Sequence, residues 1–317
     1  VPPRPPRGAG PGGPGARLDA LRARTIAICD AEYPALLREI ADPPPVLFVR
    51  GEPLSNAPVV GGVGSRRASR SGLEAARLLS AGLARAGVVV VSGFAHGIDA
   101  AAHAAALDEE GETWGVLGCG LDVPYPAAHG RLRERVVAGG AFLTELPPGT
   151  PPEPWHFPAR NRIIAGCARL VVVVEAAPRS GSLITARCAT EAGRDVGAVP
   201  GPVLGEQSAG TNALLKDGAI LVRDAEDVLR ELPEEDLARL RPAARPAARG
   251  AAPAPADPDA ARVLLALDPV EPRAADALAA ATGLSAARLS AALVLLELEG
   301  LAEALPGALF ARKAPRA

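Results

Sequence analysis

The 317-residue sequence predicts an α/β protein: a doubly wound parallel sheet of Rossmann type, followed by a winged-helix domain of three helices and a β-hairpin. Short apolar runs alternate with helical patterns over residues 58–232, which is typical of a parallel sheet covered on both faces. Three amphipathic patterns and then two short apolar runs, separated by a Pro-Gly turn, occupy residues 258–313 and predict the winged helix.

The segments around these two domains lack the apolar content of a packed core. Residues 1–15 are rich in Pro and Gly without the apolar stretch of a signal peptide, and we expect a disordered leader. Residues 16–57 predict a short extension, with one helix, a Pro-interrupted turn and one strand, that packs on the edge of the core. Residues 233–257 end in a Pro/Ala-rich stretch and predict a semi-rigid linker.

Seven strand-like runs define the predicted sheet. They lie at residues 59–63, 88–93, 113–118, 141–146, 170–176, 195–201 and 219–222. The helices between them serve as crossovers, which we expect to be right-handed.

Composition narrows the classes of function. The net charge of −2 provides no global basic field, so a polyanion site must be a local cluster of Arg side chains and backbone N–H groups. The four cysteines lie far apart, which predicts free thiols, no metal site and a reduced, cytoplasmic protein. No 18-residue apolar run occurs, so we expect no membrane span.

Polar and glycine-rich motifs follow nearly every predicted strand. The main ones are Gly64-Ser65-Arg66-Arg67, Ser92-Gly93-Phe94-Ala95-His96-Gly97-Ile98-Asp99, Gly118-Cys119-Gly120-Leu121-Asp122, Glu145, Glu175 and Arg179-Ser180-Gly181-Ser182. Parallel sheets bind ligands beyond the carboxyl ends of their strands, where Gly-rich turns and helix N-termini present N–H groups to anions. The sequence therefore predicts a crevice for a phosphate chain or a nucleic-acid backbone.

Each motif also has a structural interpretation. The glycines can serve tight turns, Asp99 and Ser182 can cap helices, and the two glutamates can be solvated strand ends. His96 and His103 fit structural histidines better than metal ligands, because no third ligand accompanies them. Two adjacent arginines in a glycine loop have no packing use, and this favours a functional role for Arg66 and Arg67.

The expected signatures of nucleotide-dependent enzymes are missing from the sequence. Arg67 stands where a dinucleotide-binding loop requires its third glycine, and the second strand ends in Ser92-Gly93 without a ribose-binding acid. No P-loop and no nucleophile elbow occur. In the winged helix, the third helix carries Arg288 as its single basic residue, so contact with protein and contact with DNA both stay open.

Taken in order, the motifs resemble those of the DprA (Smf) family of bacterial DNA-processing proteins. The matching strings cover about residues 33–222 and include GSRRASRSG, SGFAHGIDAAAH, GCGLDVPYP, FPARNRIIAG, VVEAAPRSGSLITA and GTNALLKDGA. The family's additional N-terminal helical region is largely absent, which predicts a truncated chain or an unusual start.

The resemblance implies a non-enzymatic protein, without cofactor, that binds single-stranded DNA. Such proteins protect incoming strands in natural transformation, help load RecA and form homodimers through the Rossmann-like domain. By motif position, the implied DNA-binding residues are Gly64, Ser65, Arg66, Arg67, Ser92, Gly93, His96, Gly97, Asp99, Arg160, Asn161, Arg162 and Lys216. Asp99 is expected to order its loop rather than touch phosphate. Phe94, Trp155 and Phe157 are the aromatic candidates for stacking on bases, with core packing as the alternative for each.

Two other classes stay open. The fold is also similar to that of nucleoside monophosphate phosphoribohydrolases, which carry a P-G-G-x-G-T-x-x-E signature. The corresponding loop here, Pro178 to Ala186, ends without the catalytic glutamate. A nucleotide-sensing module, the third possibility, would bind mononucleotides tightly and would not respond to oligonucleotides.

Overall fold

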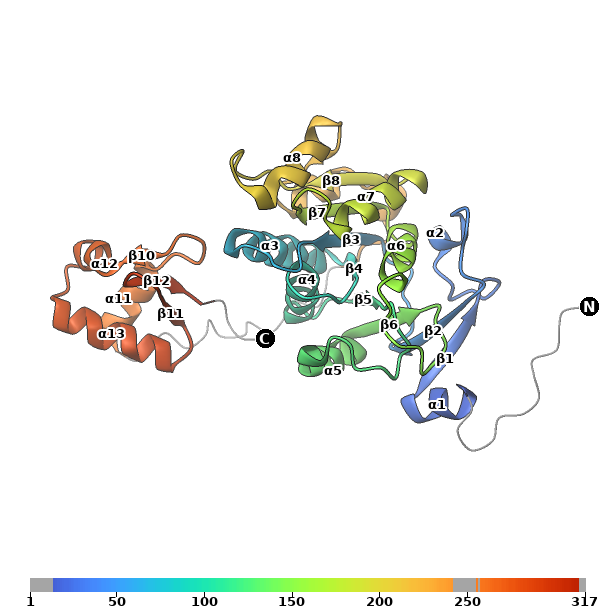
Figure 1. Cartoon of the computed structure of the whole chain (residues 1–317), viewed down its shortest axis with the longest axis horizontal. Coiled ribbons are helices and arrows are strands. Elements are labelled where there is room, and N and C mark those ends of the chain that lie inside the picture. Colours follow the sequence, from blue (N-terminus) through green and yellow to red (C-terminus); the bar gives the residue numbers. More distant parts are fainter. Residues whose placement is uncertain (1–13, 242–254, 256, 314–317) are drawn as a thin grey trace, which may run out of the picture. The chain divides into compact units, whose positions relative to one another are not determined.

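The computed structural model describes residues 14–241, 255 and 257–313, and the chain divides into two compact units, residues 1–245 and 246–317 (Figure 1). The predicted leader lies outside the described residues except for residues 14 and 15, which begin helix α1 (Pro14–Leu21). Most of the predicted linker also lies outside them.

The first unit is built on a nine-stranded sheet with the order β1-β2-β6-β5-β4-β3-β7-β8-β9. All seven predicted strands are confirmed, and each pairs in parallel with its neighbours among the seven. They are β3 (Val59–Gly64), β4 (Val89–Ser92), β5 (Thr113–Val116), β6 (Gly140–Thr144), β7 (Leu170–Glu175), β8 (Asp195–Ala198) and β9 (Ile220–Leu221). The chain runs outward from β3 to β6 and then returns to place β7 on the other side of β3. The sheet therefore has its topological switch point between β3 and β7.

The N-terminal extension differs from the prediction. It contributes two strands, β1 (Ala23–Ala27) and β2 (Val46–Gly51), with the short helix α2 (Ala35–Arg38) between them. Strand β2 pairs antiparallel with both β1 and β6. The extension thus continues the sheet by backbone hydrogen bonds instead of only packing on its edge.

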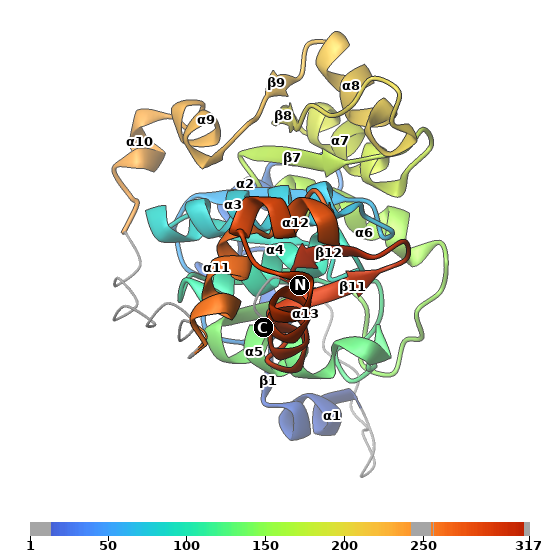
Figure 2. The same ribbon diagram turned by 90° about the vertical axis from the view of Figure 1, so that its left-hand side faces the viewer.

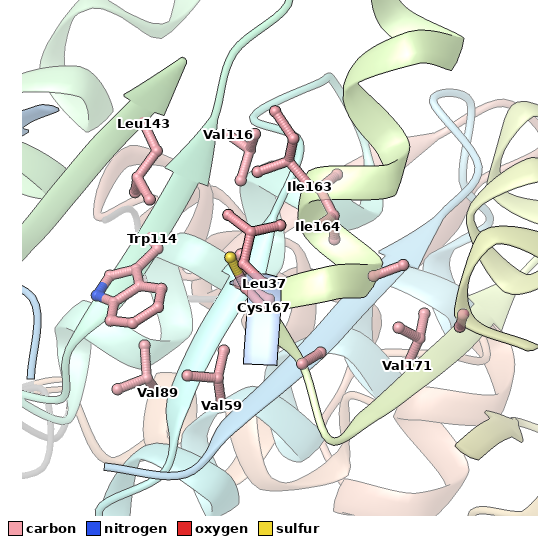
Figure 3. Close-up of a cluster of buried hydrophobic side chains, with 14 of the residues drawn as sticks. Leu37, Val59, Val89, Trp114, Val116, Leu143, Ile163, Ile164, Cys167 and Val171 are labelled. Atoms are coloured by element: carbon pink, nitrogen blue, oxygen red, sulfur yellow. The ribbon is translucent and has the colours of Figure 1, made fainter. Parts of the chain in front are cut away.

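Helices cover both faces of the sheet (Figure 1). Successive side chains along its strands point to opposite faces, and those on both faces are apolar, so each face needs a cover. Val90 packs into the cluster with α3 (Arg70–Ala86) and α4 (Ile98–Asp108), whereas Val89 and Val91 face the cluster with α6 (His156–Cys167). That second cluster includes Trp114, Leu143, Ile163 and Ile164 (Figure 3). Residues 58–232 also contain α5 (Gly130–Gly139), α7 (Gly181–Glu191), α8 (Ala209–Lys216) and α9 (Ala225–Arg230).

The ordered core continues beyond residue 233, where the linker was predicted to begin. Helix α10 (Glu234–Leu237) lies in that range and brings Asp236 into a buried position. The Asp236 carboxylate accepts a hydrogen bond of 2.5 Å from Arg169 Nε. A buried carboxylate requires such a partner, which explains why a segment of low apolar content is fixed on the core.

The second unit has the three predicted helices, α11 (Pro258–Ala266), α12 (Ala275–Thr282) and α13 (Ala286–Leu298), and the predicted hairpin of β11 (Ala302–Leu305) and β12 (Leu309–Arg312) (Figure 2). A two-residue strand, β10 (Arg273–Ala274), adds a third member to its sheet. Leu278, Leu289, Leu293 and Leu296 form much of its core. This architecture is a winged helix.

In the described part of the chain, no helix is by itself long and apolar enough to cross a membrane, and α12 with α13 meets that test only as a pair bent by 106°.

Candidate functional site

A cleft of ≈ 780 Å³ opens at the switch point, beyond the carboxyl ends of β3 and β7. Its walls come from the loops that follow β3, β4, β5, β6, β7 and β8 and from the first turns of α6 and α7. The lining residues that carry polar or cationic groups are Ser65, Arg66, Arg67, Asp99, Arg160, Asn161, Arg179, Ser180, Ser182, Glu206 and Gln207. The fold therefore brings segments from six parts of the sequence into one crevice, as the strand-end motifs predict.

The loop after β3 holds two exposed arginines at this cleft. Ser65 N donates to the Glu175 carbonyl oxygen over 2.8 Å, and Arg67 N donates to Ser65 Oγ over 3.2 Å. Ser69 then caps α3 by accepting from Gly72 N over 3.0 Å. With the backbone tied at both ends, Arg66 and Arg67 are presented to solvent from a fixed loop.

Glu175, at the end of β7, holds that loop in place by hydrogen bonds to its carboxylate. Its side chain is only 5% exposed and accepts from Ser69 N over 3.0 Å and also from the Ser69 hydroxyl. A Cβ at position 72 would come within 2.3 Å of Glu175 Oε2, so the carboxylate fits because residue 72 is glycine. The interpretation of Glu175 as a solvated strand end is therefore wrong. Its partner lies 106 residues away, and no sequence signal connects the two.

In the loop after β4, polar side chains hold the backbone in place by hydrogen bonds. Ser92 Oγ donates to the Gly62 carbonyl over 2.6 Å, and Asp99 Oδ2 accepts from Ala95 N over 3.2 Å. Gly97 has φ +76°, and the N–H of Ile98 after it donates to the Ser65 carbonyl over 3.2 Å. A main-chain hydrogen bond thus joins the loop after β3 to the loop after β4.

Phe94 is not available for stacking on a base. It is 1% exposed, adopts φ 57°, and packs edge-to-face on Phe142 with ring centroids 4.7 Å apart. Core packing, the alternative role, is the one that the structure supports. Trp155 is 66% exposed but lies outside the cleft lining.

Arg160 supplies a buried positive charge beneath the cleft. It is 5% exposed, and its Nη1 donates to the carbonyl oxygens of Gly93, over 2.7 Å, and of Val116. Burial lowers the pKa of Arg160 to about 10, so the guanidinium stays cationic at neutral pH. Burial also raises the pKa of Asp99, and the charge of Arg160 opposes that rise. A Cβ on Gly93 would meet both groups, Arg160 Nη2 at 2.6 Å and Asp99 Oδ2 at 2.8 Å.

Phe157 places an aromatic ring beside these cations. The guanidinium carbon of Arg66 lies 5.3 Å from its ring centroid, and that of Arg160 lies 6.0 Å away. Tyr125 packs against the same ring at 5.4 Å. Phe157 is half-buried and lines the cleft, so one wall combines a π face with cationic groups, a combination that suits nucleobases and phosphates together.

Other predicted site residues lie outside the main cleft. Arg162 forms a bidentate pair with Glu145, at 2.6 and 2.7 Å, and also contacts Asp42. Its hydrogen bonds to Glu145 raise the pKa of Arg162. Lys216 ends α8 and is exposed. Neither Arg162 nor Lys216 belongs to the cleft lining.

The histidines of the second loop have separate environments. His96 is exposed and packs edge-to-face on His129 at 4.5 Å, beside a small hollow of ≈ 20 Å³ that adjoins the cleft. His103 is fully buried, and its Nδ1 lies 2.7 Å from Thr113 Oγ1. Burial lowers the pKa of His103 to about 3, so this side chain is neutral at physiological pH. Among the described residues, no cluster of three or more His, Cys, Asp or Glu side chains could hold a metal ion.

Several cleft residues are absent from the predicted DNA contacts, among them Arg179, Gln207 and Tyr125. Arg179 belongs to a predicted strand-end motif and lines the cleft, with φ 67°. Gln207 lies in the segment before α8, with its Oε1 3.4 Å from Ser65 Oγ. Tyr125 comes from the loop after β5. The strand-end motif points to Arg179, and Tyr125 lies in the matching string GCGLDVPYP, whereas Gln207 reaches the cleft through tertiary structure alone.

The fold and the cleft define a class: a Rossmann-like protein with a cationic crevice at its switch point and an appended winged helix. The family model described as DNA recombination-mediator protein A matches residues 24–233, and the DprA winged helix domain matches residues 245–308. The chain therefore belongs to the DprA (Smf) family of DNA-processing proteins.

Individual relatives agree with this assignment. DNA processing protein DprA of Streptococcus pneumoniae is 48% identical over 208 residues, which is 65% of this chain and 73% of the relative. Protein Smf of Synechocystis is 37% identical over 313 residues, 90% of this chain and 79% of the relative.

Solved structures of two relatives share the fold. The X-ray structure of DprA from S. pneumoniae has a TM-score of 0.65 and 45% identity, with 69% of this chain and 78% of that chain covered. DNA processing protein A from Helicobacter pylori, whose single-stranded DNA binding mode is described, has a TM-score of 0.60 and 27% identity. There 66% of this chain and 95% of that chain are covered.

Proposed function

We propose that this chain binds the backbone of single-stranded DNA in the cleft between β3 and β7, protects incoming strands and helps load RecA in transformation and recombination. One observation carries the DNA-binding part. Exposed Arg66 and buried Arg160 lie on the same wall as the Phe157 ring, at 5.3 and 6.0 Å from its centroid. Such a wall can bind a phosphate through its cations and stack a base on its aromatic ring. A single strand offers both groups, because its bases are unstacked and accessible. The single-stranded DNA binding described for the H. pylori relative supports this proposal.

The proposed contact residues differ in role. Ser65, Arg66, Arg67, Arg160 and Asn161 line the cleft and are proposed to face the strand. Gly64 belongs to the same lining, and Gly93 and His96 border the adjoining hollow. Ser92, Gly97 and Asp99 are proposed to hold the loops in place. Arg162 and Lys216 lie outside the cleft lining, so any contact they make would be with a strand that extends beyond it.

The RecA and homodimer parts of the proposal rest on family membership. The last strand of the sheet, β9, is a candidate dimer edge because it pairs on one side only, with β8, and its Leu221 is 49% exposed. Val203 and Leu204, in the segment between β8 and α8, are 89% and 100% exposed. Apolar side chains at this end of the unit suit a protein contact.

The proposal is tested by comparing single- and double-stranded oligonucleotides in a gel shift at two salt concentrations. We expect a marked preference for the single strand, with binding that weakens as salt rises, because bound phosphates release counterions. Equal affinity for the two forms, or no binding to either, would overturn the proposed function.

Replacing Arg66 with alanine is expected to weaken binding to unrelated single-stranded sequences by about tenfold, the effect of losing about 1.4 kcal/mol of a charge-assisted contact. The slope of log affinity against log salt should flatten by ~0.7, the value for one phosphate on a single strand. Fluorescence anisotropy across a salt titration measures both quantities. Arg230→Ala is the control, since Arg230 is 63% exposed on α9 and pairs with Glu226 there. An unchanged slope would remove Arg66 from the interface.

Replacing Glu175 with alanine is expected to lower single-stranded DNA affinity by about tenfold although every cleft arginine is kept. The reason is that Ser69 N and its hydroxyl lose their buried acceptor, so the Arg66–Arg67 loop is no longer fixed. Glu175→Gln keeps one oxygen for Ser69 N and should retain most of the affinity. Amide exchange over residues 65–69 should speed up in the alanine variant only, and equal exchange in both variants would contradict the clamp.

We propose no catalytic residue. In the loop that corresponds to the phosphoribohydrolase signature, the position of the catalytic glutamate is Ala186, which is 2% exposed within α7. Incubation with AMP is expected to release no adenine. Efficient release would favour the enzyme, and tight AMP binding without oligonucleotide binding would favour a nucleotide sensor.

A further inference from the structure

The outward face of helix α13 in the winged-helix unit is apolar. Ala287, Ala291, Val294 and Leu298 follow one another at spacings of four, three and four residues, which places them in one row along the helix. Val294 is 51% exposed and Leu298 is 80% exposed. The buried leucines of α13 already fill the core of the unit, so this second row is available to another surface.

The charges around α13 do not suit a phosphate backbone. Its one cation, Arg288, donates Nε and Nη2 to the two carboxylate oxygens of Asp259, both at 2.7 Å. Glu297 and Glu299 are exposed at the other end of the helix. Over residues 257–313 the unit has eight carboxylates against five basic side chains. A helix that reads the major groove normally presents cations and amides there, so this face fits a protein and not a duplex.

We propose that the occupant of this face is α13 of a second copy of the chain, antiparallel to the first and related to it by a two-fold axis. In that register Leu298 lies over the partner's Ala287, and Val294 lies over the partner's Ala291. Each large side chain then meets a small one, and the same pairs repeat on the other side of the axis, as an isologous interface requires. A parallel pairing would set Leu298 against Leu298 and leave alanine against alanine.

Charge complementarity selects the same orientation. The antiparallel register brings Glu297 and Glu299 of one copy toward Arg288 of the other. Arg288 uses Nε and Nη2 for Asp259, and Nη1 can serve a further acceptor. A parallel pairing would instead place the acidic ends together. This contact lies in the winged helix and requires neither DNA binding in the cleft nor a dimer edge at β9.

Sedimentation velocity of the full chain over a range of concentrations tests the proposal. A single pair of short helices buries less area than a stable standard interface, so we expect this contact to add a weak, concentration-dependent association to any dimer formed at β9. Leu298→Lys and Val294→Lys should each weaken it at least fivefold, because a lysine would be set into the apolar row. Leu78→Lys is the control, since Leu78 is 63% exposed on α3 in the other unit. If both α13 variants sediment like the native chain at every concentration, the proposal is wrong, and a different protein becomes the candidate partner.

Disulfide trapping tests the orientation. A chain with both Ala287→Cys and Leu298→Cys should form a covalent dimer under mild oxidation, because the antiparallel register places these positions opposite each other. The single variants keep the native cysteines and should stay monomeric on a non-reducing gel, since each new thiol would face the far end of the partner's helix. A covalent dimer from either single variant, or none from the double variant, would overturn the antiparallel pairing.

Discussion

Replacing Gly97 with alanine is expected to lower the single-stranded DNA affinity by more than tenfold and the free energy of unfolding by about 2 kcal/mol, the scale of one strained backbone residue. Gly97 has φ +76° and ψ −123°, a conformation that side chains rarely adopt. A Cβ there would lie 2.2 Å from the Ser65 carbonyl oxygen and 2.9 Å from the carbonyl carbon of Arg66. The main chain of the arginine loop would have to move, and the Ile98–Ser65 hydrogen bond that joins the two loops would be lost.

Gly181→Ala is the matched control for this substitution. Gly181 lines the same cleft at the start of α7, and a Cβ there would meet no atom within 4 Å. The control should therefore keep its stability. Fluorescence anisotropy and urea unfolding measure the two quantities for both variants. A Gly97→Ala variant with native affinity would show that the position of the arginine loop does not set DNA binding.

The strands were predictable because their signal is local. Runs such as Val88 to Val91 are apolar at every position, and the structure shows why: Val90 faces one core cluster while Val89 and Val91 face the other. The edge of the sheet was less predictable. Whether residues 23–27 pair with β2 depends on a partner strand 23 residues later in the sequence, and propensity alone does not choose partners.

The site was predictable to the extent that it follows strand ends. The FPARNR motif shows the limit, because it offers Arg160 and Arg162 as equivalent cations. Two residues along a helix turn the side chain by about 200°, so one points into the cleft while the other reaches Glu145. The helical phase relative to the sheet decides between them, and that phase is a tertiary property. Glu175 was underestimated for a similar reason, since its role comes from Ser69 across the switch point.

Replacing Arg160 with methionine is expected to lower the free energy of unfolding by about 3 kcal/mol, the cost of removing one partner from a buried polar arrangement. The variant leaves the carbonyls of Gly93 and Val116 without their donor. It also leaves Asp99, 6% exposed, without the positive charge that opposes its burial. Urea unfolding at pH 8 measures the loss. Arg162→Met on the same helix should cost at most about 1 kcal/mol, because its pair with Glu145 is partly solvated.

The Asp99 part of this cost can be separated by pH and by a second substitution. Burial raises the pKa of Asp99 in the folded state above its ordinary value of 3.8. At a pH between the pKa of the unfolded chain and the pKa of the folded protein, the folded protein therefore binds more protons than the unfolded chain. Stability from this group then increases as pH falls, and the deficit of Arg160→Met should be smaller at pH 5 than at pH 8. Adding Asp99→Asn should recover part of the deficit at pH 8, since no buried charge is left uncompensated. If the double variant is as unstable as Arg160→Met at both pH values, the loss arises from the two carbonyls, and Arg160 acts as a backbone clamp that is independent of Asp99.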